Sequence, residues 1–313
     1  MAEKKRKSKK KNIGFKIFLG VMSTLILVIG GYAYSVYRNL NYTNDAIYTP
    51  VQTQNLRDSA VDLKNQDSIS ILLLGIDNGT EGRTEEGRSD TMVVVTINPK
   101  TQRTTFVSIP RDTFSEIVGN NSYDKINHAY WYGGAEMSIN TVQKLLGIPI
   151  DYYASVNMEG IQQIVDVLGG IEVQSPLAFT IGEYTFTEGT NQLDGAAALA
   201  FSRMRSDDPE QDTGRQERQR IVLAAISKKV LSRETLQNYQ DILHSLSVNM
   251  NTNFQASDYI ALQKYGYVDA ISNIQQDHLG GVGGLRDDIY YSFVDGAELA
   301  RVQDVLQAEL ELK

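Results

Sequence analysis

The chain has 313 residues, 42% of them hydrophobic, and it contains no cysteine, which excludes disulfides, thiolate catalysis and zinc–thiolate sites. The first 16 residues hold eight of the 30 basic and one of the 38 acidic residues, so residues 17–313 hold 22 basic and 37 acidic residues, a net charge of −15. A domain that acidic binds nucleic acid poorly, so no nucleic-acid partner is expected.

A basic tail followed by an apolar run opens the chain. Residues 17–36 carry no charge and reach the length of about 20 residues that a helix needs to cross a bilayer. Basic segments stay on the cytoplasmic side, so we expect a cytoplasmic tail at 1–16, a transmembrane helix at 17–37, a polar stalk at 38–67 and an extracytoplasmic domain at 68–313. A cleaved signal peptide is the alternative, but its apolar core is shorter and ends in small residues. The expected location is a single-pass position in the cell membrane, and an extracytoplasmic domain without cysteine fits a Gram-positive cell surface.

Three short apolar runs open the predicted domain. Residues 68–76, 91–97 and 104–109 are of strand length and rich in aliphatic and β-branched side chains. Short connections favour antiparallel neighbours, so we expect a meander in which the first strand ends, the second begins and the third ends at one edge of a sheet. The residues at that edge are Asp77, Asp90 and Arg111.

Helices and further strands alternate along the rest of the chain. The expected helices cover residues 135–146, 158–168, 196–200, 215–231, 233–246 and 296–310. The expected strands cover residues 152–156, 171–173 and 289–293, and the glycine-rich run 280–284 is expected to be a flexible turn. This alternation predicts an α/β fold with a central mixed β-sheet and helices on its faces.

Arginines are concentrated in one part of the domain, where five fall within the 18 positions of residues 203–220. Arginine can bind phosphate through two parallel hydrogen bonds from its planar guanidinium. Arg203 and Arg205 are two residues apart and would share one face of a strand. Taken singly, such residues are usually solvated, and Arg218 and Arg220 are expected to be solvated surface charges.

A helix that begins within this stretch would complete an anion site. Thr213 and Gln216 have the spacing of a capping box, which places Arg215 in the first turn and Gln219 one turn later. Two carboxylates at a neighbouring sheet edge, those of Asp77 and Asp90, suit Mg²⁺, which takes one or two carboxylates together with phosphate oxygens. An anion-binding site combined with Mg²⁺ is typical of enzymes that transfer phosphoryl groups.

Several motifs follow one another in a fixed order. They are Leu-Leu-Gly-Ile-Asp (73–77), Arg-Ser-Asp-Thr-Met (88–92), Ser-Ile-Pro-Arg-Asp (108–112), Lys-Ile-Asn-His-Ala (125–129), Leu-Gly-Gly-Ile-Glu-Val (168–173), Leu-Asp-Gly (193–195), Ser-Arg-Met-Arg (202–205) and Asp-Thr-Gly-Arg-Gln-Glu-Arg-Gln (212–219). With the basic tail and apolar run before them, they resemble the LytR-CpsA-Psr family of Gram-positive bacteria. The resemblance covers the core motifs at 68–232, and residues 233–313 are less distinctive.

The resemblance implies an α/β/α sandwich with a hydrophobic pocket for a lipid chain. It implies a phosphotransferase that moves an anionic glycopolymer, such as wall teichoic acid or capsular polysaccharide, from a polyprenyl (pyro)phosphate carrier to the C6 hydroxyl of N-acetylmuramic acid in peptidoglycan. The implied partners are that carrier-linked glycopolymer, peptidoglycan and membrane lipid. The short segment 113–124 implies that access for acceptor or lipid differs from relatives with longer insertions.

The motif match also implies roles for individual residues. Asp77 and Asp90 would hold Mg²⁺. Asp212 would orient an arginine or assist as a base, and it would act with Arg111 and Arg203 as a catalytic residue. The residues that would bind the pyrophosphate are Arg88, Arg111, Lys125, Arg203, Arg205, Arg215 and Gln219.

Two other functions compete with the enzyme. One is a regulator of cell-envelope synthesis, such as a transcriptional attenuator, but an anchored domain with a net charge of −15 is poorly suited to bind DNA. The other is a non-catalytic protein that binds polyprenyl phosphate or glycan, which would keep the arginines without needing the aspartate pair.

Overall fold

The computed structural model describes residues 48–54, 56–57, 59–77, 87–205, 208–210, 212–230 and 250–312. These residues belong to one compact unit, Thr43–Lys313. The transmembrane helix expected at 17–37 and the helix expected at 233–246 lie outside the described residues. Among the helices that are described, none has the length and apolar character needed to span a membrane.

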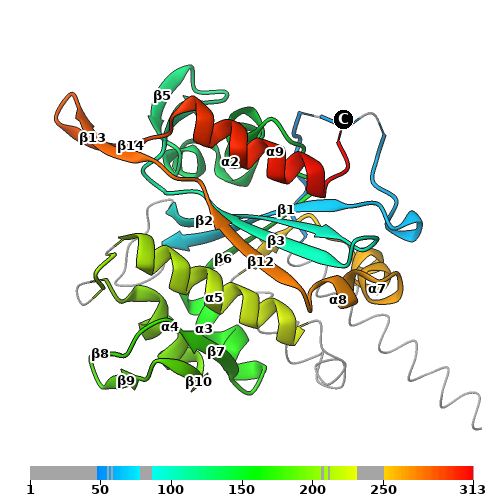
Figure 1. The fold of residues 1–313 in the computed structure, drawn as a ribbon. Coiled ribbons are helices and arrows are strands. Elements are labelled where there is room, and N and C mark those ends of the chain that lie inside the picture. Colours follow the sequence, from blue (N-terminus) through cyan, green and yellow to red (C-terminus); the bar gives the residue numbers. More distant parts are fainter. Residues whose placement is uncertain are drawn as a thin grey trace, which may run out of the picture. The chain divides into compact units, whose positions relative to one another are not determined.

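A six-stranded mixed sheet lies at the centre of this unit (Figure 1). β1, β2 and β3 pair antiparallel, which confirms the predicted meander, whereas β6 and β12 run parallel to their neighbours β1 and β3. The C-terminal ends of β1, β3, β6 and β12 therefore meet the start of β2 at one edge, which we call the carboxyl edge. In the order of pairing, the strands are β11 (Met250–Thr252), β6 (Tyr152–Asn157), β1 (Ile69–Asp77), β2 (Arg88–Asn98), β3 (Arg103–Ser108) and β12 (Ile274–His278).

Both faces of the sheet are buried, because side chains alternate between them with the two-residue period of a strand. Leu72 of β1 and Val94 of β2 enter one core cluster, whereas their neighbours Ile71 and Val93 enter another on the opposite face. Burial on both sides explains why these strands appear in the sequence as nearly continuous apolar runs.

Helices cover the two faces of the sheet (Figure 1). α2 (His128–Leu146) and α9 (Gly296–Glu309) pack on one face through residues such as Val142 and Val302. α5 (Asp212–Val230), α7 (Ala256–Lys264) and α8 (Tyr267–Ala270) cover the other face through Ala224, Leu262 and Tyr267. Over the described residues, the fold is therefore the predicted α/β class, with a central mixed sheet between helices.

A separate core cluster joins α5 to a group of shorter elements. Phe201 of α4 packs there against Phe179 and Phe186, with ring centroids 5.6 Å and 5.3 Å away. Asp194 caps α4, since its side chain accepts a hydrogen bond from the backbone N–H of Ala197. The elements are α3 (Met158–Val167), β7 (Ile171–Ser175), β8 (Phe179–Ile181), β9 (Tyr184–Phe186), β10 (Gly189–Leu193) and α4 (Gly195–Arg203).

Two hairpins flank the carboxyl edge, β4 (Phe114–Ile117) with β5 (Ser122–Lys125) and β13 (Val282–Arg286) with β14 (Ile289–Phe293). The first lies in the short segment 113–124, and the second corrects the flexible turn expected at 280–284. Glycines fit within β13 because the aromatic rings of β14 occupy the space of their missing side chains. A Cβ at Gly283 would meet Tyr290, and one at Gly284 would lie 3.1 Å from Phe293.

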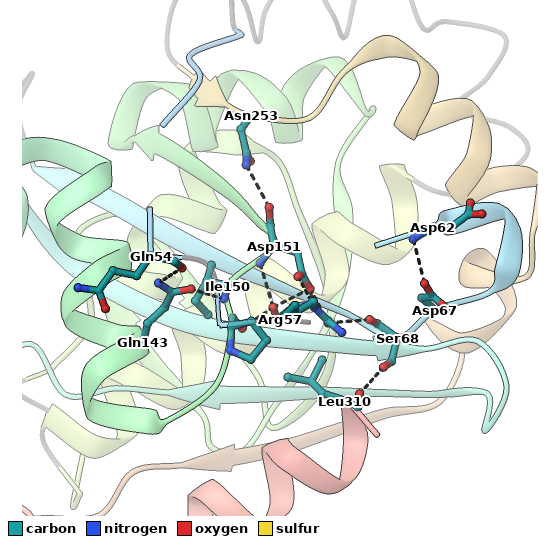
Figure 2. A network of polar contacts seen from close by, with 12 residues as sticks. Gln54, Arg57, Asp62, Asp67, Ser68, Gln143, Ile150, Asp151, Asn253 and Leu310 are labelled. Atoms are coloured by element: carbon teal, nitrogen blue, oxygen red, sulfur yellow. Dashed lines mark hydrogen bonds and ion pairs between the residues drawn. The ribbon is translucent and has the colours of Figure 1, made fainter. Parts of the chain in front are cut away.

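The segment that leads into β1 packs against the domain (Figure 2). Arg57 donates hydrogen bonds to both carboxylate oxygens of Asp151, at 2.6 Å and 2.8 Å, and to the carbonyl of Ser68 at 2.9 Å. Tyr48 forms a bridge with Thr252 of β11. The described part of the segment expected to be a stalk, from Tyr48 on, therefore lies against the domain.

Candidate functional site

Opposite charges alternate at the carboxyl edge. Asp90 Oδ2 accepts a hydrogen bond from Arg111 Nη1 at 2.9 Å, and Arg111 Nε lies 3.6 Å from Asp112 Oδ2. Asp112 Oδ1 in turn pairs with Lys125 Nζ at 2.7 Å. We call Asp90, Arg111, Asp112 and Lys125 the edge cluster. Their side chains are 18–28% exposed, so each is held by the protein and still within reach of a ligand.

A β-bulge sets the position of Asp90. Gly75 pairs with Thr91 and the next residue of β1, Ile76, pairs with Ser89, so Asp90 is an extra residue in β2. Bulges re-aim a side chain, and they are common beside active sites. Asp77 is the last residue of β1, and its backbone pairs with Arg88 at this edge. The side chain of Asp77 lies outside the described structure.

Arg88 and Asn127 extend the edge cluster towards α2. The Arg88 guanidinium carbon lies 5.8 Å from the centre of the Trp131 ring, and Asn127 Nδ2 lies 3.5 Å from Asp90 Oδ1. Arg88 and Lys125, predicted from the sequence as ligands of pyrophosphate, are thus gathered with Arg111 at one edge.

A hydrogen-bonded pair, Asp124 and His128, lies next to these residues. His128 Nδ1 is 2.7 Å from Asp124 Oδ2, and the hydroxyls of Tyr132 and Tyr291 contact the same carboxylate at 3.3 Å and 3.4 Å. Burial raises the pKa of Asp124, but hydrogen bonds from His128 and from the Lys125 backbone outweigh it, so that the pKa lies below the usual value. The sequence does not single out this pair, because a lone histidine four residues after an aspartate is not a specific signal.

An apolar cavity of about 180 Å³ lies between the sheet and α5. Gly75 and Thr91, which line it, are two residues from Asp77 and one from Asp90, so the cavity ends beside the edge cluster. A side chain at Gly75 would come within 2.9 Å of Thr91 Cβ. The rest of the cavity lining is largely aliphatic and includes Leu73, Val156, Ile161, Val222, Leu223 and Ile226.

The first half of α5 faces the same edge. Gln219, Val222 and Ile226 line the cavity and share a helix face because they are three and four residues apart. Arg215 precedes Gln219 by one turn, about 6 Å along the helix axis, on that face. In Figure 1 the N-terminal end of α5 and the C-terminal end of β1 lie at the same end of the sheet. Asp212 is the first residue of α5, and its side chain lies outside the described structure.

Arg203 and Arg205 do not share a strand face, contrary to expectation. α4 runs to Arg203, because Ala198, Phe201 and Ser202 bury one side of an alanine-rich helix. Ser202 lines the cavity, so the two arginines, both exposed, follow directly after a cavity residue.

Arg218 and Arg220 are buried, which corrects their expected role as solvated charges. Arg218 is fully buried, pairs with Asp208 and also donates to the backbone carbonyl of Met204. Arg220 is 7% exposed, and burial lowers the pKa of its guanidinium. Arg218 and Arg220 are two residues apart, so they point to different sides of α5, and α5 is buried on both of these sides. The sequence alone showed only their charge.

The described carboxylate of Asp90 has one oxygen that a metal ion could share with other oxygen ligands. Among the described residues, Asp90 Oδ1 accepts only the long contact from Asn127, so this oxygen is the less engaged of the two. Within the described part of the chain, no three His, Asp or Glu side chains are placed to hold an ion together. Mg²⁺ accepts such sites because it combines one or two carboxylates with phosphate oxygens. Mg²⁺ at Asp77 and Asp90 stays a prediction.

Comparisons with known proteins match nearly the whole chain. The sequence model of the LytR_cpsA_psr family matches residues 34–308. A polyisoprenyl-teichoic acid–peptidoglycan teichoic acid transferase TagU from Enterococcus faecalis is 44% identical over 308 residues, which cover 98% of this chain and 100% of that protein.

Solved structures share the fold. The crystal structure of Bacillus subtilis TagU is 38% identical, with a TM-score of 0.66 over 79% of this chain and 98% of that one. A structure described as a transcriptional regulator from Enterococcus faecalis is 42% identical, with a TM-score of 0.72 over 82% of this chain and 92% of that one.

Proposed function

The chain belongs to the LytR_cpsA_psr family, and on this basis we propose that it is a membrane-anchored, Mg²⁺-dependent phosphotransferase. It moves an anionic glycopolymer from a polyprenyl pyrophosphate carrier to peptidoglycan. We favour wall teichoic acid over capsular polysaccharide as this polymer. The name of the TagU relatives supports this polymer and this acceptor. The observation that carries the proposal is the junction of an apolar cavity with the edge cluster, because the carrier is an apolar chain that ends in a polyanion.

The cavity would take the part of the polyprenyl chain next to the phosphates. Its aliphatic lining offers no competing polar groups except Thr91, Ser202, Gln219 and Tyr259, and the first three lie towards the carboxyl edge. Burying the chain there is favourable at about 25 cal/mol per Å² of apolar surface. The pyrophosphate would then emerge between the edge cluster and the first turns of α5.

Arg111 is the group best prepared to stabilise charge in the reaction. Asp90 and Asp112 hold its guanidinium from two sides, so it needs little reorganisation when negative charge develops on the phosphate. Lys125, held by Asp112, and Arg88 would bind from the sheet side, and Arg203, Arg205, Arg215 and Gln219 from the α4–α5 side. Asp212 would orient one of these arginines. Mg²⁺ bound by Asp77 and Asp90 would neutralise charge on the phosphate oxygens.

A reconstituted transfer assay tests the proposal. The purified protein would be mixed with a lipid-pyrophosphate-linked polymer and peptidoglycan oligomers, with Mg²⁺ or with EDTA. We expect transfer only with Mg²⁺, and we expect Asp77→Ala and Asp90→Ala to abolish it while the fold is kept. Asp304 is an exposed carboxylate on α9, so Asp304→Ala is the matched control and should be active. Transfer at the full rate in EDTA would contradict the metal.

The cavity can be tested separately. Leu223→Trp should fill it and weaken transfer from a long-chain donor far more than from a short-chain donor that does not reach it. Leu285→Trp, which changes an exposed leucine on β13, serves as the control. Equal effects on both donors would place the lipid chain elsewhere.

The location follows from the same proposal, since peptidoglycan lies outside the cytoplasmic membrane. Residues 17–37 would anchor the chain, with the basic tail inside and the domain outside. Protease added to intact protoplasts should remove the domain and spare the tail, with lysed cells as control. A domain that survives this treatment would contradict the topology.

A further inference from the structure

The proposed reaction fixes the side from which the acceptor arrives. Phosphoryl transfer places the attacking and leaving oxygens roughly in line on opposite sides of phosphorus. Under the proposed function, on which this inference rests, the leaving group is polyprenyl phosphate with its chain in the cavity beneath α5. The acceptor hydroxyl then approaches the edge cluster from the opposite face of the sheet, which α2 covers.

The start of α2 forms this approach. Asn127 precedes the helix and contacts Asp90, and Trp131, one turn later, lies under the Arg88 guanidinium. His128 sits between them in sequence, with its ring centre 6.3 Å from that of Trp131. Trp131 is 42% exposed, and an exposed aromatic ring at this point suits an acceptor built of sugar rings.

The Asp124–His128 pair has the arrangement of a base and the group that orients it. Asp124 Oδ2 accepts from Nδ1 at 2.7 Å, which fixes the tautomer and leaves Nε2 as the nitrogen that can take a proton. Asp124 is itself held by the Lys125 backbone N–H at 2.8 Å and by the two tyrosine hydroxyls. A carboxylate that is fixed from three sides is a rigid support for an imidazole.

We infer that His128, oriented by Asp124, is the general base that activates the hydroxyl of a peptidoglycan sugar. Nε2 takes the proton as the hydroxyl oxygen forms its bond to the phosphorus nearest the glycopolymer. The bond from that phosphorus to the bridging oxygen breaks, and the bridging oxygen leaves with the electron pair as part of polyprenyl phosphate. The product is a phosphodiester between glycopolymer and peptidoglycan, and the proton on His128 passes to water.

The charge of His128 depends on the groups that face it. A general base must be neutral to take a proton, so the groups around the ring matter. The titratable and charged groups around it are Asp124 and Lys125 of β5, Tyr132 of α2, Tyr291 of β14 and, beyond Trp131, Arg88 of β2.

Single-turnover transfer with donor in place tests the base. His128→Gln should lower the rate by roughly 10²-fold or more, the range in which a lost general base falls, with donor binding and melting temperature unchanged. The wild-type rate should fall on the acid side as imidazole is protonated, and this fall should be missing from the variant. Asp124→Asn should lower the rate in the same way. His278→Gln, which changes an exposed histidine at the end of β12, should behave as wild type.

Rescue by a small molecule separates chemistry from structure. In His128→Ala, added imidazole should restore part of the rate, which a purely structural defect would not allow. A His128→Gln variant at the wild-type rate with the wild-type pH profile would overturn the inference. So would a slow His128→Ala variant that binds donor normally and ignores imidazole. A wild-type protein that transfers nothing would instead contradict the proposed function itself.

Discussion

Two arginine–aspartate pairs of the same chemistry lie in very different surroundings. Arg218 and Asp208 have side chains that are 0% and 2% exposed, whereas Arg111 and Asp90 are 28% and 26% exposed. The guanidinium of the buried pair makes further contacts within the protein. Arg218 also donates a hydrogen bond to the Met204 carbonyl, and its guanidinium lies 5.5 Å from the centre of the Phe179 ring. The edge pair is joined to Asp112 and Lys125 in a chain of charges that solvent reaches.

The difference shows that the degree of burial determines the role of such an arginine–aspartate pair. A buried charge cannot lose its partner without a large cost, so Arg218 ties the segment between α4 and α5 to the body of α5. A partly exposed guanidinium can exchange part of its environment for a phosphate at small cost, so Arg111 is suited to bind substrate. Substitutions in the two pairs should therefore change different properties.

The largest effect is expected for Arg218→Ala, in the free energy of unfolding. Removing one partner leaves the Asp208 carboxylate buried without its cation, which typically costs about 3–5 kcal/mol. Denaturant unfolding measures the loss. The double variant Arg218→Met with Asp208→Leu should regain most of the stability, because an apolar pair does not leave a buried charge. A loss below about 1 kcal/mol, the scale of an exposed pair, would mean that the burial of this pair has been misjudged.

Arg111→Ala should leave stability nearly intact and remove activity. Losing a preorganised donor to the transition state typically costs about 10²–10³ in rate, equivalent to about 2.7–4 kcal/mol. Arg111→Lys should not restore it, because an ammonium cannot provide the planar fork. Single-turnover transfer is the measurement, and Arg286→Ala on the β13 hairpin is the control. If Arg111→Ala were unstable and Arg218→Ala merely inactive, the two roles would be reversed.

The central fold could be predicted because its signals are local and strong. The apolar runs of β1, β2 and β3 and their short connections were sufficient to place the meander. The short strands β8, β9, β11 and β12 were missed, because three to five residues carry no clear period. β13 was missed because its glycines depend on Tyr290 and Phe293, a cross-strand contact that propensity does not contain.

The site was predictable by residue type and not by burial. The meander brought Asp90 and Arg111 together as expected, since antiparallel pairing alone fixes that edge. The bulge at Asp90 depends on register and left no sequence signal. Arg215 and Arg218 are one turn apart on the same helix, yet only the packing of α5 against Asp208 makes the second of them structural.

Gly214→Ala approaches the buried pair from its other side. A Cβ at Gly214 would run into the Asp208 carboxylate, which must then move away from Arg218. Overpacking of this kind typically costs about 1–3 kcal/mol, less than losing the pair outright. Gly296→Ala at the start of α9 is the matched control, because nothing lies within 4 Å of the added atom. Chemical denaturation of the two variants makes the comparison, and equal stability would contradict the close approach.

The smallest effect is expected for an arginine whose side chain is largely exposed. Arg301 is 44% exposed and contacts Glu298 and Asp277 at 2.7 Å. Its hydrogen bond lowers the pKa of Glu298 from 4.5 to about 2, so this stabilisation is present above pH 4.5 and is lost as the pH falls through about 2. Solvent screening limits the effect of Arg301→Ala to about 1 kcal/mol or less at pH 7. The difference in melting temperature between variant and wild type should therefore stay constant down to about pH 4.5 and shrink as the pH falls from there towards 2, and it should also shrink in high salt. A gap that widened on acidification would mean that Arg301 stabilises the fold through its aliphatic stem and not through these carboxylates.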